Sequence, residues 1–156
     1  PAMSFRHNDS MAELGFQIRP QLDPKQYRLR VNAGRVKRTD ESYYIPDVMV
    51  FPTSLAKEFR DRPDVLEVYE APLPFVAEGW SPSTGDYDVD SKLPEYQRRG
   101  DFEIWRLHPF ERTVTAWRRR PDGTYDELQF AGGKIQLHAL PNVVVDLDAL
   151  FTTVDR

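Results

Sequence analysis

The sequence has 156 residues, a length typical of a single domain, and its 40% hydrophobic and 29% charged residues exclude a disordered chain. It contains no cysteine, which excludes disulfides, zinc–thiolate centres and thiol nucleophiles and favours a reducing, cytoplasmic location. The net charge of −4 argues against a protein that grips duplex nucleic acid with its whole surface. No apolar run approaches the roughly 18 residues of a membrane span, so we expect no membrane partner.

The N-terminal half is expected to contain one helix followed by strands. Residues 1–3 are interpreted as a cloning scar or a trimmed start. Helical spacing of apolar residues predicts an amphipathic helix over 4–22, with Asp9 or Ser10 as its N-cap. Alternating or continuous apolar runs then predict strands at 27–31, at 36–39 (pairing back across Ala33-Gly34), at 43–51 (buried on both faces) and at 73–80, with a helical turn at 55–60.

The C-terminal half is expected to add a second helix and several short strands. That helix lies between 86 and 99, with Asp90 or Ser91 as its cap because Pro94 is tolerated best in a first turn, and with Gly100 at its end. Further strands are expected at 102–107, 113–118, 125–130 and 135–137, and a closing helical turn at 146–151. The order of elements predicts one α/β or α+β domain over 4–152 around a mixed sheet.

Two carboxylates stand alone in apolar strands. Asp47 and Glu78 are each the single charge of their run, and a buried lone carboxylate either takes up a proton or finds a partner. Each could reach solvent or an arginine at a strand end. Alternatively, both converge on one divalent cation, in which case oxygen ligands without cysteine favour Mg²⁺ or Mn²⁺ over zinc.

Three polar residues share one face of the second predicted helix. Asp88, Lys92 and Tyr96 follow one another at four-residue intervals, which is also the spacing of an ordinary solvated ion pair. Six basic residues and no acid lie between Lys25 and Arg38, whereas acids crowd between Glu58 and Asp90. Such a charge division fits a metal-dependent enzyme acting on a phosphate polymer, and it also arises by chance in soluble proteins.

In the order of these features the sequence resembles the Uma-type family of restriction-endonuclease-like proteins, within the PD-(D/E)XK nuclease superfamily. The matching segments are YIPDVMV at 44–50, FVAEGWSPST at 75–84, YDVDSKLPEY at 87–96 and DLDALF at 146–151. The resemblance implies a restriction-endonuclease-like α/β core, in which a mixed central β-sheet is flanked by helices. We expect that the hairpin that precedes the first helix in this family is missing from this chain.

The resemblance also implies a Mg²⁺- or Mn²⁺-dependent endonuclease that hydrolyses DNA, acting as a homodimer. Asp47 and Glu78 would be metal ligands, together with the carbonyl oxygen of Gly79. The usual superfamily position for lysine holds Trp80, so Lys92 on the following helix would supply the amine. Asp88, Tyr96 and Glu103 are candidate supporting residues, and Arg28, Arg30, Arg35 and Lys37 are candidate nucleic-acid contacts.

Two alternatives stay open at this point. The chain could keep the nuclease fold without catalysis and serve as a binding or dimerisation module. His7 matches a histidine of the family near the start of the first helix, but we interpret it as a surface or capping residue. Glu103 could equally form an ion pair with an arginine.

Overall fold

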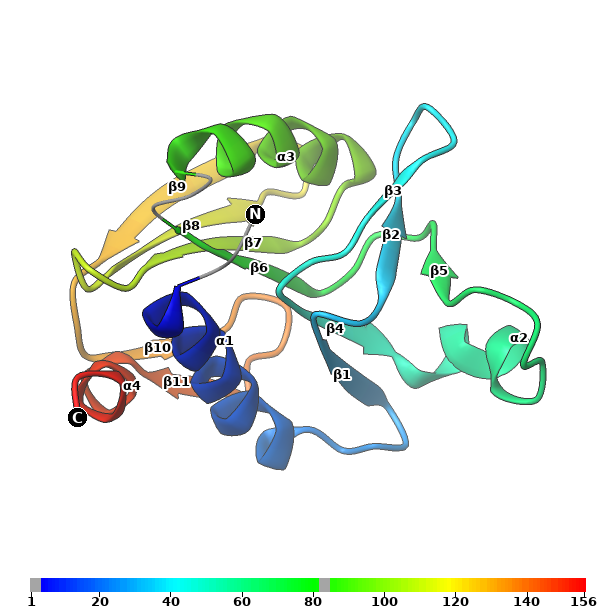
Figure 1. Ribbon diagram of the computed structural model, residues 1–156. Coiled ribbons are helices and arrows are strands. Elements are labelled where there is room, and N and C mark those ends of the chain that lie inside the picture. The colour runs from blue at the N-terminus through cyan, green and yellow to red at the C-terminus, as the bar shows by residue number, and fades with distance from the viewer. Residues whose placement is uncertain (1–3, 82–84) are drawn as a thin grey trace.

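The computed structural model describes residues 4–81 and 85–156, and within residues 85–90 it describes the backbone alone. Its centre is a six-stranded sheet in the order β1-β4-β6-β7-β8-β9 (Figure 1). Neighbouring strands run antiparallel except for β6 and β7, which are parallel. The strands are β1 (Tyr27–Val31), β4 (Val48–Pro52), β6 (Phe75–Gly79), β7 (Glu103–His108), β8 (Thr113–Arg119) and β9 (Tyr125–Phe130).

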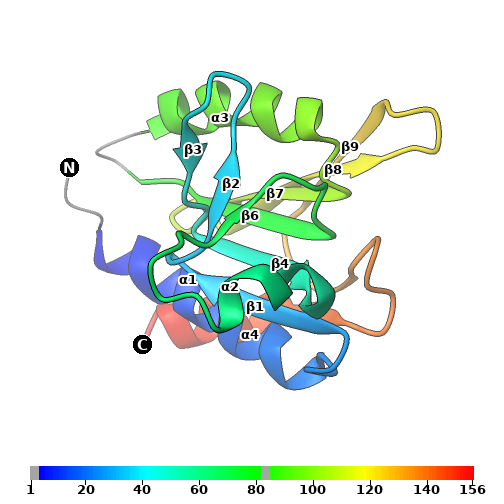
Figure 2. The same ribbon diagram turned by 90° about the vertical axis from the view of Figure 1, so that its right-hand side faces the viewer.

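Helices cover both faces of this sheet. Helix α3 (Gly85–Arg99) lies on one face, and α1 (Phe5–Ile18) and α4 (Leu147–Val154) lie on the other (Figures 1 and 2). Their arrangement around a mixed sheet confirms the predicted α/β fold class. The remaining short helices are η1 (Arg19–Gln21), η2 (Thr53–Ala56) and α2 (Lys57–Arg60).

Alternation along the strands divides the core into two layers. On β4, Val48 and Val50 pack with α1 and α4, whereas Met49 and Phe51 belong to the layer that contains Tyr96 of α3. Successive side chains of a strand point to opposite faces, so a strand between two helical layers must be apolar at every position. All four of these β4 side chains are fully buried, as the sequence predicted.

A small arm lies beside the central sheet and corrects two strand predictions. It consists of β3 (Tyr43–Tyr44), β2 (Arg35–Lys37) and β5 (Val68–Tyr69), in that order. The predicted return of 36–39 onto 27–31 is wrong, because β2 pairs with β3 and β5 while β1 pairs with β4. The single strand predicted at 43–51 is divided, because Pro46 lacks the N–H that a central strand needs.

The predicted helix caps also need correction. Ser4, and neither Asp9 nor Ser10, caps α1: its hydroxyl accepts the His7 N–H at 3.1 Å. Helix α3 begins at Gly85, so Pro94 lies in its interior and the expected cap at Asp90 or Ser91 is wrong. Gly100 ends α3 as predicted, with a φ of 81° that suits glycine.

The C-terminal segment completes the core layer that lies between the sheet and helices α1 and α4. A short ladder pairs β10 (Lys134–Gln136) with β11 (Val144–Asp146), a strand that the sequence did not predict. Asp146 then caps α4 by accepting the Ala149 N–H at 3.0 Å. Within the described residues, no helix has the length and apolar character needed to cross a bilayer.

We expect Leu14→Ala to lower the free energy of unfolding by about 3 kcal/mol, because it leaves a cavity where α1 packs on the sheet. Leu14 is fully buried in the core layer between the sheet and helices α1 and α4. Urea unfolding followed by circular dichroism measures the change. Phe16→Ala is the matched control on the same helix, because the Phe16 side chain is 74% exposed. Equal losses in the two variants would contradict this packing.

Candidate active site

The sheet register places Asp47 and Glu78 next to each other. Strands β4 and β6 are antiparallel with Val48 opposite Ala77, so one further step of the ladder sets Asp47 opposite Glu78. The beginning of β4 therefore meets the end of β6, although the two residues are far apart in the sequence. Two carboxylates that stood alone in the sequence are neighbours in the fold.

The Asp47 carboxylate is held by α1 and by the main chain of β6. Its Oδ2 accepts a hydrogen bond from His7 Nε2 at 2.9 Å and another from the Gly79 N–H at 2.8 Å. The other ring nitrogen of His7 lies 3.2 Å from Asn8 Oδ1. Burial tends to raise the pKa of Asp47, but the hydrogen bonds from His7 and Gly79 outweigh it and leave this pKa below its usual value.

His7 is the residue of this site whose role was interpreted wrongly from the sequence. Its side chain is 5% exposed and binds Asp47, so its interpretation as a surface or capping residue is wrong. A helix start is normally exposed, but here the first turn of α1 lies against the ends of β4 and β6. The family match at this position was the signal that pointed to a role in the site.

Gly79 is required by the closeness of α1 to β6. A Cβ at this position would lie 2.8 Å from Cδ2 of His7, which is too close for two carbon atoms. The absence of a side chain lets the imidazole reach Asp47 across the end of the strand. The glycine therefore belongs to the architecture of the site.

Glu78 lies beside Asp47 and also meets α3. Its Oε1 accepts hydrogen bonds from Lys92 Nζ at 3.1 Å and from the Tyr96 hydroxyl at 2.5 Å. Its Oε2 is buried and has no hydrogen-bond partner among the described residues. One unpaired carboxylate oxygen in a buried site costs free energy unless a ligand fills the position.

The pKa values reflect this crowding. Burial, followed by the nearby Asp47 charge, raises the pKa of Glu78 to about 8, and Lys92 opposes that rise. Burial and the adjacent Glu78 carboxylate raise the pKa of Tyr96 well above its usual value, so its hydroxyl stays a donor. Two carboxylates in one buried place repel each other, and a cation between them would remove that cost.

The donor set fits a hard divalent cation. The two acids supply oxygen ligands, and the unpartnered Glu78 Oε2 is a buried position for a positive charge. Among the residues described, no three His, Cys, Asp or Glu side chains form a metal-binding group. Magnesium is commonly held by one or two carboxylates with water and substrate completing its shell, so two acids meet its usual protein requirement.

The other candidate residues are distributed over the molecule. Glu103 is buried at the start of β7, away from the Glu78 end of the sheet, and it binds Arg118 Nε at 2.7 Å and the His138 N–H at 2.7 Å. The Asp88 side chain lies outside the description. Arg28 and Arg30 lie on β1, whereas Arg35 and Lys37 lie on β2 of the arm, so the basic segment of the sequence is divided between two sheets.

Comparison with known proteins identifies the family of this chain. The Uma2 family, described as "Putative restriction endonuclease", matches residues 1–149. The chain belongs to the Uma2 family. The resemblance seen in the sequence is thereby confirmed, and Uma2 membership makes the protein nuclease-like. No curated protein matches the sequence.

A solved structure supports the fold of this Uma2 protein. It is titled a putative nuclease belonging to DUF820 from Anabaena variabilis ATCC 29413, and it shares 16% sequence identity with this chain. The match has a TM-score of 0.74 and covers 99% of this chain and 84% of the other. The restriction-endonuclease-like fold predicted from the sequence is confirmed.

A double-mutant cycle between His7→Ala and Asp47→Ala should give a coupling free energy of about 1–3 kcal/mol in urea unfolding. The cause is that either substitution leaves the other partner buried without its hydrogen bond. His138→Ala replaces His7→Ala in a control cycle, because His138 is exposed and its ring contacts the Arg119 carbonyl. Additive effects in the first cycle would show that the His7–Asp47 contact contributes nothing.

Proposed function

We propose that this Uma2 protein is a Mg²⁺- or Mn²⁺-dependent endonuclease that hydrolyses phosphodiester bonds of DNA. The proposal rests mainly on one observation: Asp47, Glu78 and Lys92 come from three separate elements to one sheet end, where a buried Glu78 oxygen has no partner among the described residues. Membership of a family described as a putative restriction endonuclease supports the same reaction class.

Asp47 and Glu78 would hold the cation, with the Gly79 carbonyl oxygen as a further ligand. When bound, such a cation lowers the pKa of its water and offsets negative charge on the scissile phosphate. The chain prepares its ligands beforehand. His7 and the Gly79 N–H fix Asp47 through one oxygen, and Tyr96 fixes Glu78 through one oxygen.

Lys92 would act as the charge-balancing amine. It lies 3.1 Å from Glu78 and its side chain is 14% exposed, so its ammonium group is held close to the carboxylates with little solvent screening. From that position it can orient an attacking water and stabilise negative charge that develops on the phosphate. Tyr96 contacts Glu78, so its role is to position that acid, while a direct contact with phosphate stays a prediction.

A non-catalytic binding or dimerisation role is the second candidate. One observation favours it: within the described part of the chain, no group of three metal-binding side chains is present. Such a protein would bind neither Mg²⁺ nor Mn²⁺ at this place, and substitutions of the two acids would leave its interactions unchanged.

We expect Asp47→Asn, Glu78→Gln and Lys92→Met each to reduce DNA cleavage by at least about 100-fold. The first two changes remove a carboxylate that would hold the cation, and the third removes the positive charge that would balance the charge developing on the phosphate. Cleavage of a plasmid in the presence of Mg²⁺ measures the effect. Glu111→Gln and Lys134→Met are matched controls at exposed positions and should cleave at the wild-type rate. Thermal melting verifies that each variant is folded. Full activity in folded Glu78→Gln would refute the assignment.

Metal removal is the second test. We expect EDTA to abolish cleavage and Mg²⁺ or Mn²⁺ to restore it, because the two adjacent carboxylates supply the ligands of the proposed cation. Calorimetric titration with Mn²⁺ should give a binding signal in the wild type that is lost in Glu78→Gln. Cleavage that persists in EDTA contradicts the metal-dependent mechanism, and a wild type that does not bind the cation favours the non-catalytic role.

A further inference from the structure

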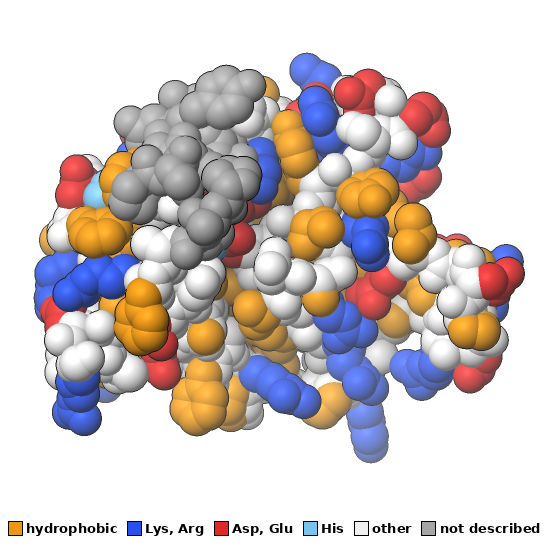
Figure 3. All heavy atoms as spheres, viewed as in Figure 1, with side chains coloured by type: hydrophobic (Ala, Val, Ile, Leu, Met, Phe, Trp, Pro, Cys, Tyr) orange, Lys and Arg blue, Asp and Glu red, His pale blue; other side chains and the backbone are white. Residues whose placement is uncertain are grey.

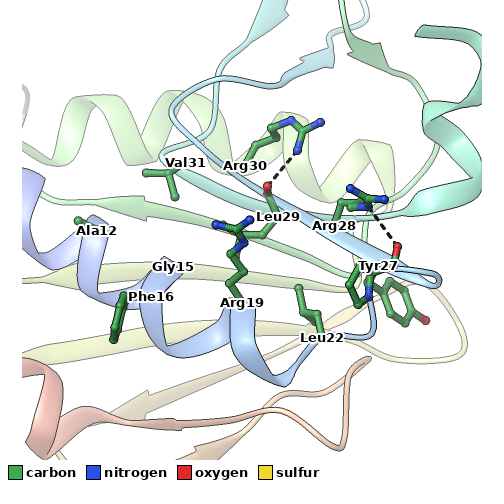
Figure 4. A pocket seen from close by; sticks show the side chains of 11 residues that line it. Ala12, Gly15, Phe16, Arg19, Leu22, Tyr27, Arg28, Leu29, Arg30 and Val31 are labelled. Carbon is green, nitrogen blue, oxygen red and sulfur yellow. Dashed lines mark hydrogen bonds between the residues drawn. The ribbon is translucent and has the colours of Figure 1, made fainter. Parts of the chain in front are cut away.

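A basic surface lies along β1, one of the two edge strands of the central sheet. A groove of about 630 Å³ lies between α1 and β1 (Figure 4). A second groove of about 560 Å³ adjoins it, sharing Pro24 and Arg28, and reaches α2. Figure 3 shows Lys and Arg side chains gathered over this lower right part of the molecule. Five exposed cations along the two grooves form a surface that we call the basic track: Arg19, Lys25, Arg28, Lys57 and Arg60.

The charges of the basic track are unpaired. Within the described residues, the side chains of Arg19, Lys25, Lys57 and Arg60 take part in no hydrogen bond or ion pair, and Arg28 donates only to the Pro24 carbonyl at 3.1 Å. All five side chains are exposed. Cations elsewhere commonly meet an acid, as Arg118 meets Glu103. Five cations that form no ion pair among the described residues are therefore concentrated on one face of a chain whose net charge is −4.

Acids near the basic track are few. Glu58 stands between Lys57 and Arg60 on α2, Asp61 lines the second groove, and Asp23 accepts the main-chain N–H of Lys25 at 3.0 Å. The other basic residues of this part of the sequence are engaged elsewhere. Arg30 pairs with Glu67 at 3.1 Å, Lys37 pairs with Glu70 at 3.0 Å, and Arg35 lies over the ring of Tyr43. Of the four nucleic-acid contacts predicted from the sequence, Arg28 alone belongs to the basic track.

Strand β1 and helix α1 connect the basic track to the candidate active site. Asn32 directly follows β1 and donates its N–H to the Asp47 carbonyl at 2.8 Å, so the end of β1 touches a proposed metal ligand. Helix α1 joins the two places as well, because His7 binds Asp47 while Arg19 follows its last turn. Twelve residues separate His7 from Arg19, and a helical rise of about 1.5 Å per residue corresponds to about 18 Å.

We propose that the basic track binds the phosphate backbone of the DNA segment that flanks the scissile phosphate on one side. This inference rests on the proposed function, which supplies the polymer that enters the site. Phosphates of one strand follow one another at about 3.4 Å per base pair, so the span to Arg19 corresponds to about five base pairs. An acidic protein segment is the other polyanion that such a face attracts, and the continuity with the phosphodiester site favours DNA.

The test compares two variants of equal net charge. In the track variant, Arg19, Lys25, Lys57 and Arg60 are all changed to Gln. In the control variant, Arg38, Arg98, Arg120 and Lys134, which lie outside the two grooves, are changed to Gln. Both changes remove four positive charges, so a difference between the variants reports the place of the charge and is independent of its sum. Thermal melting verifies that both proteins are folded.

Binding is measured by fluorescence anisotropy with a labelled duplex of about 30 base pairs, in EDTA so that no cleavage occurs. We expect the track variant to bind at least about tenfold more weakly than the control variant at low salt. A plot of log affinity against log salt concentration has a negative slope, and we expect this slope to be less steep by about 3 to 4 in the track variant. The reason is that each lost phosphate contact reduces its magnitude by about 0.9. Equal affinities of the two variants would overturn the proposal, as would wild-type protein that binds no DNA.

Two further measurements complete the test. Polyglutamate that displaces DNA as efficiently, charge for charge, as unlabelled duplex would overturn the assignment of DNA and indicate an acidic protein partner. Cleavage of the same duplex with Mg²⁺ is measured on the wild type in parallel. If the track variant binds more weakly than the control but the wild type does not cleave, the inference about the basic track stands and the proposed nuclease function is refuted. If the wild type cleaves but the two variants bind equally well, the inference about the basic track alone is refuted.

Discussion

Two acids at one buried sheet end are the constraint on which the site depends. The antiparallel ladder of β4 and β6 makes Asp47 and Glu78 neighbours, and burial makes their mutual repulsion expensive. The fold offsets this cost from both sides of the sheet. Helix α1 supplies His7 to Asp47, and α3 supplies Lys92 and Tyr96 to Glu78. Polar side chains from α1 and α3 thus hold the pair, while apolar side chains of the same helices pack on the sheet.

The sequence was informative where periodicity and burial agree. The continuous apolar runs around Met49 and Val76 identified central strands, and the single charge in each run identified Asp47 and Glu78. The spacing of Lys92 and Tyr96 on one helix face was also sufficient, because both side chains do reach Glu78. Local pattern is enough when one face of one element makes the contact.

Prediction failed where a tertiary contact outweighs a local preference. Nothing in the surroundings of His7 indicates that a helix start will be buried, since that depends on the way α1 crosses the ends of β4 and β6. The need for glycine at Gly79 depends on the same crossing. The basic segment of the sequence also suggested one continuous cluster of nucleic-acid contacts, which the fold does not form. Asn32 takes a φ of 50°, and the chain leaves the central sheet between Arg30 and Arg35.

The edge strand β1 has a consequence for solubility. On its outer side β1 has no neighbouring strand among the described residues, and an open edge of this kind can pair with the edge of another molecule and start aggregation. Arg28 is exposed on this strand and forms no ion pair with the described residues, so a second copy of β1 laid against the first would meet a positive charge. A positive charge at such an edge opposes pairing with the edge of another molecule.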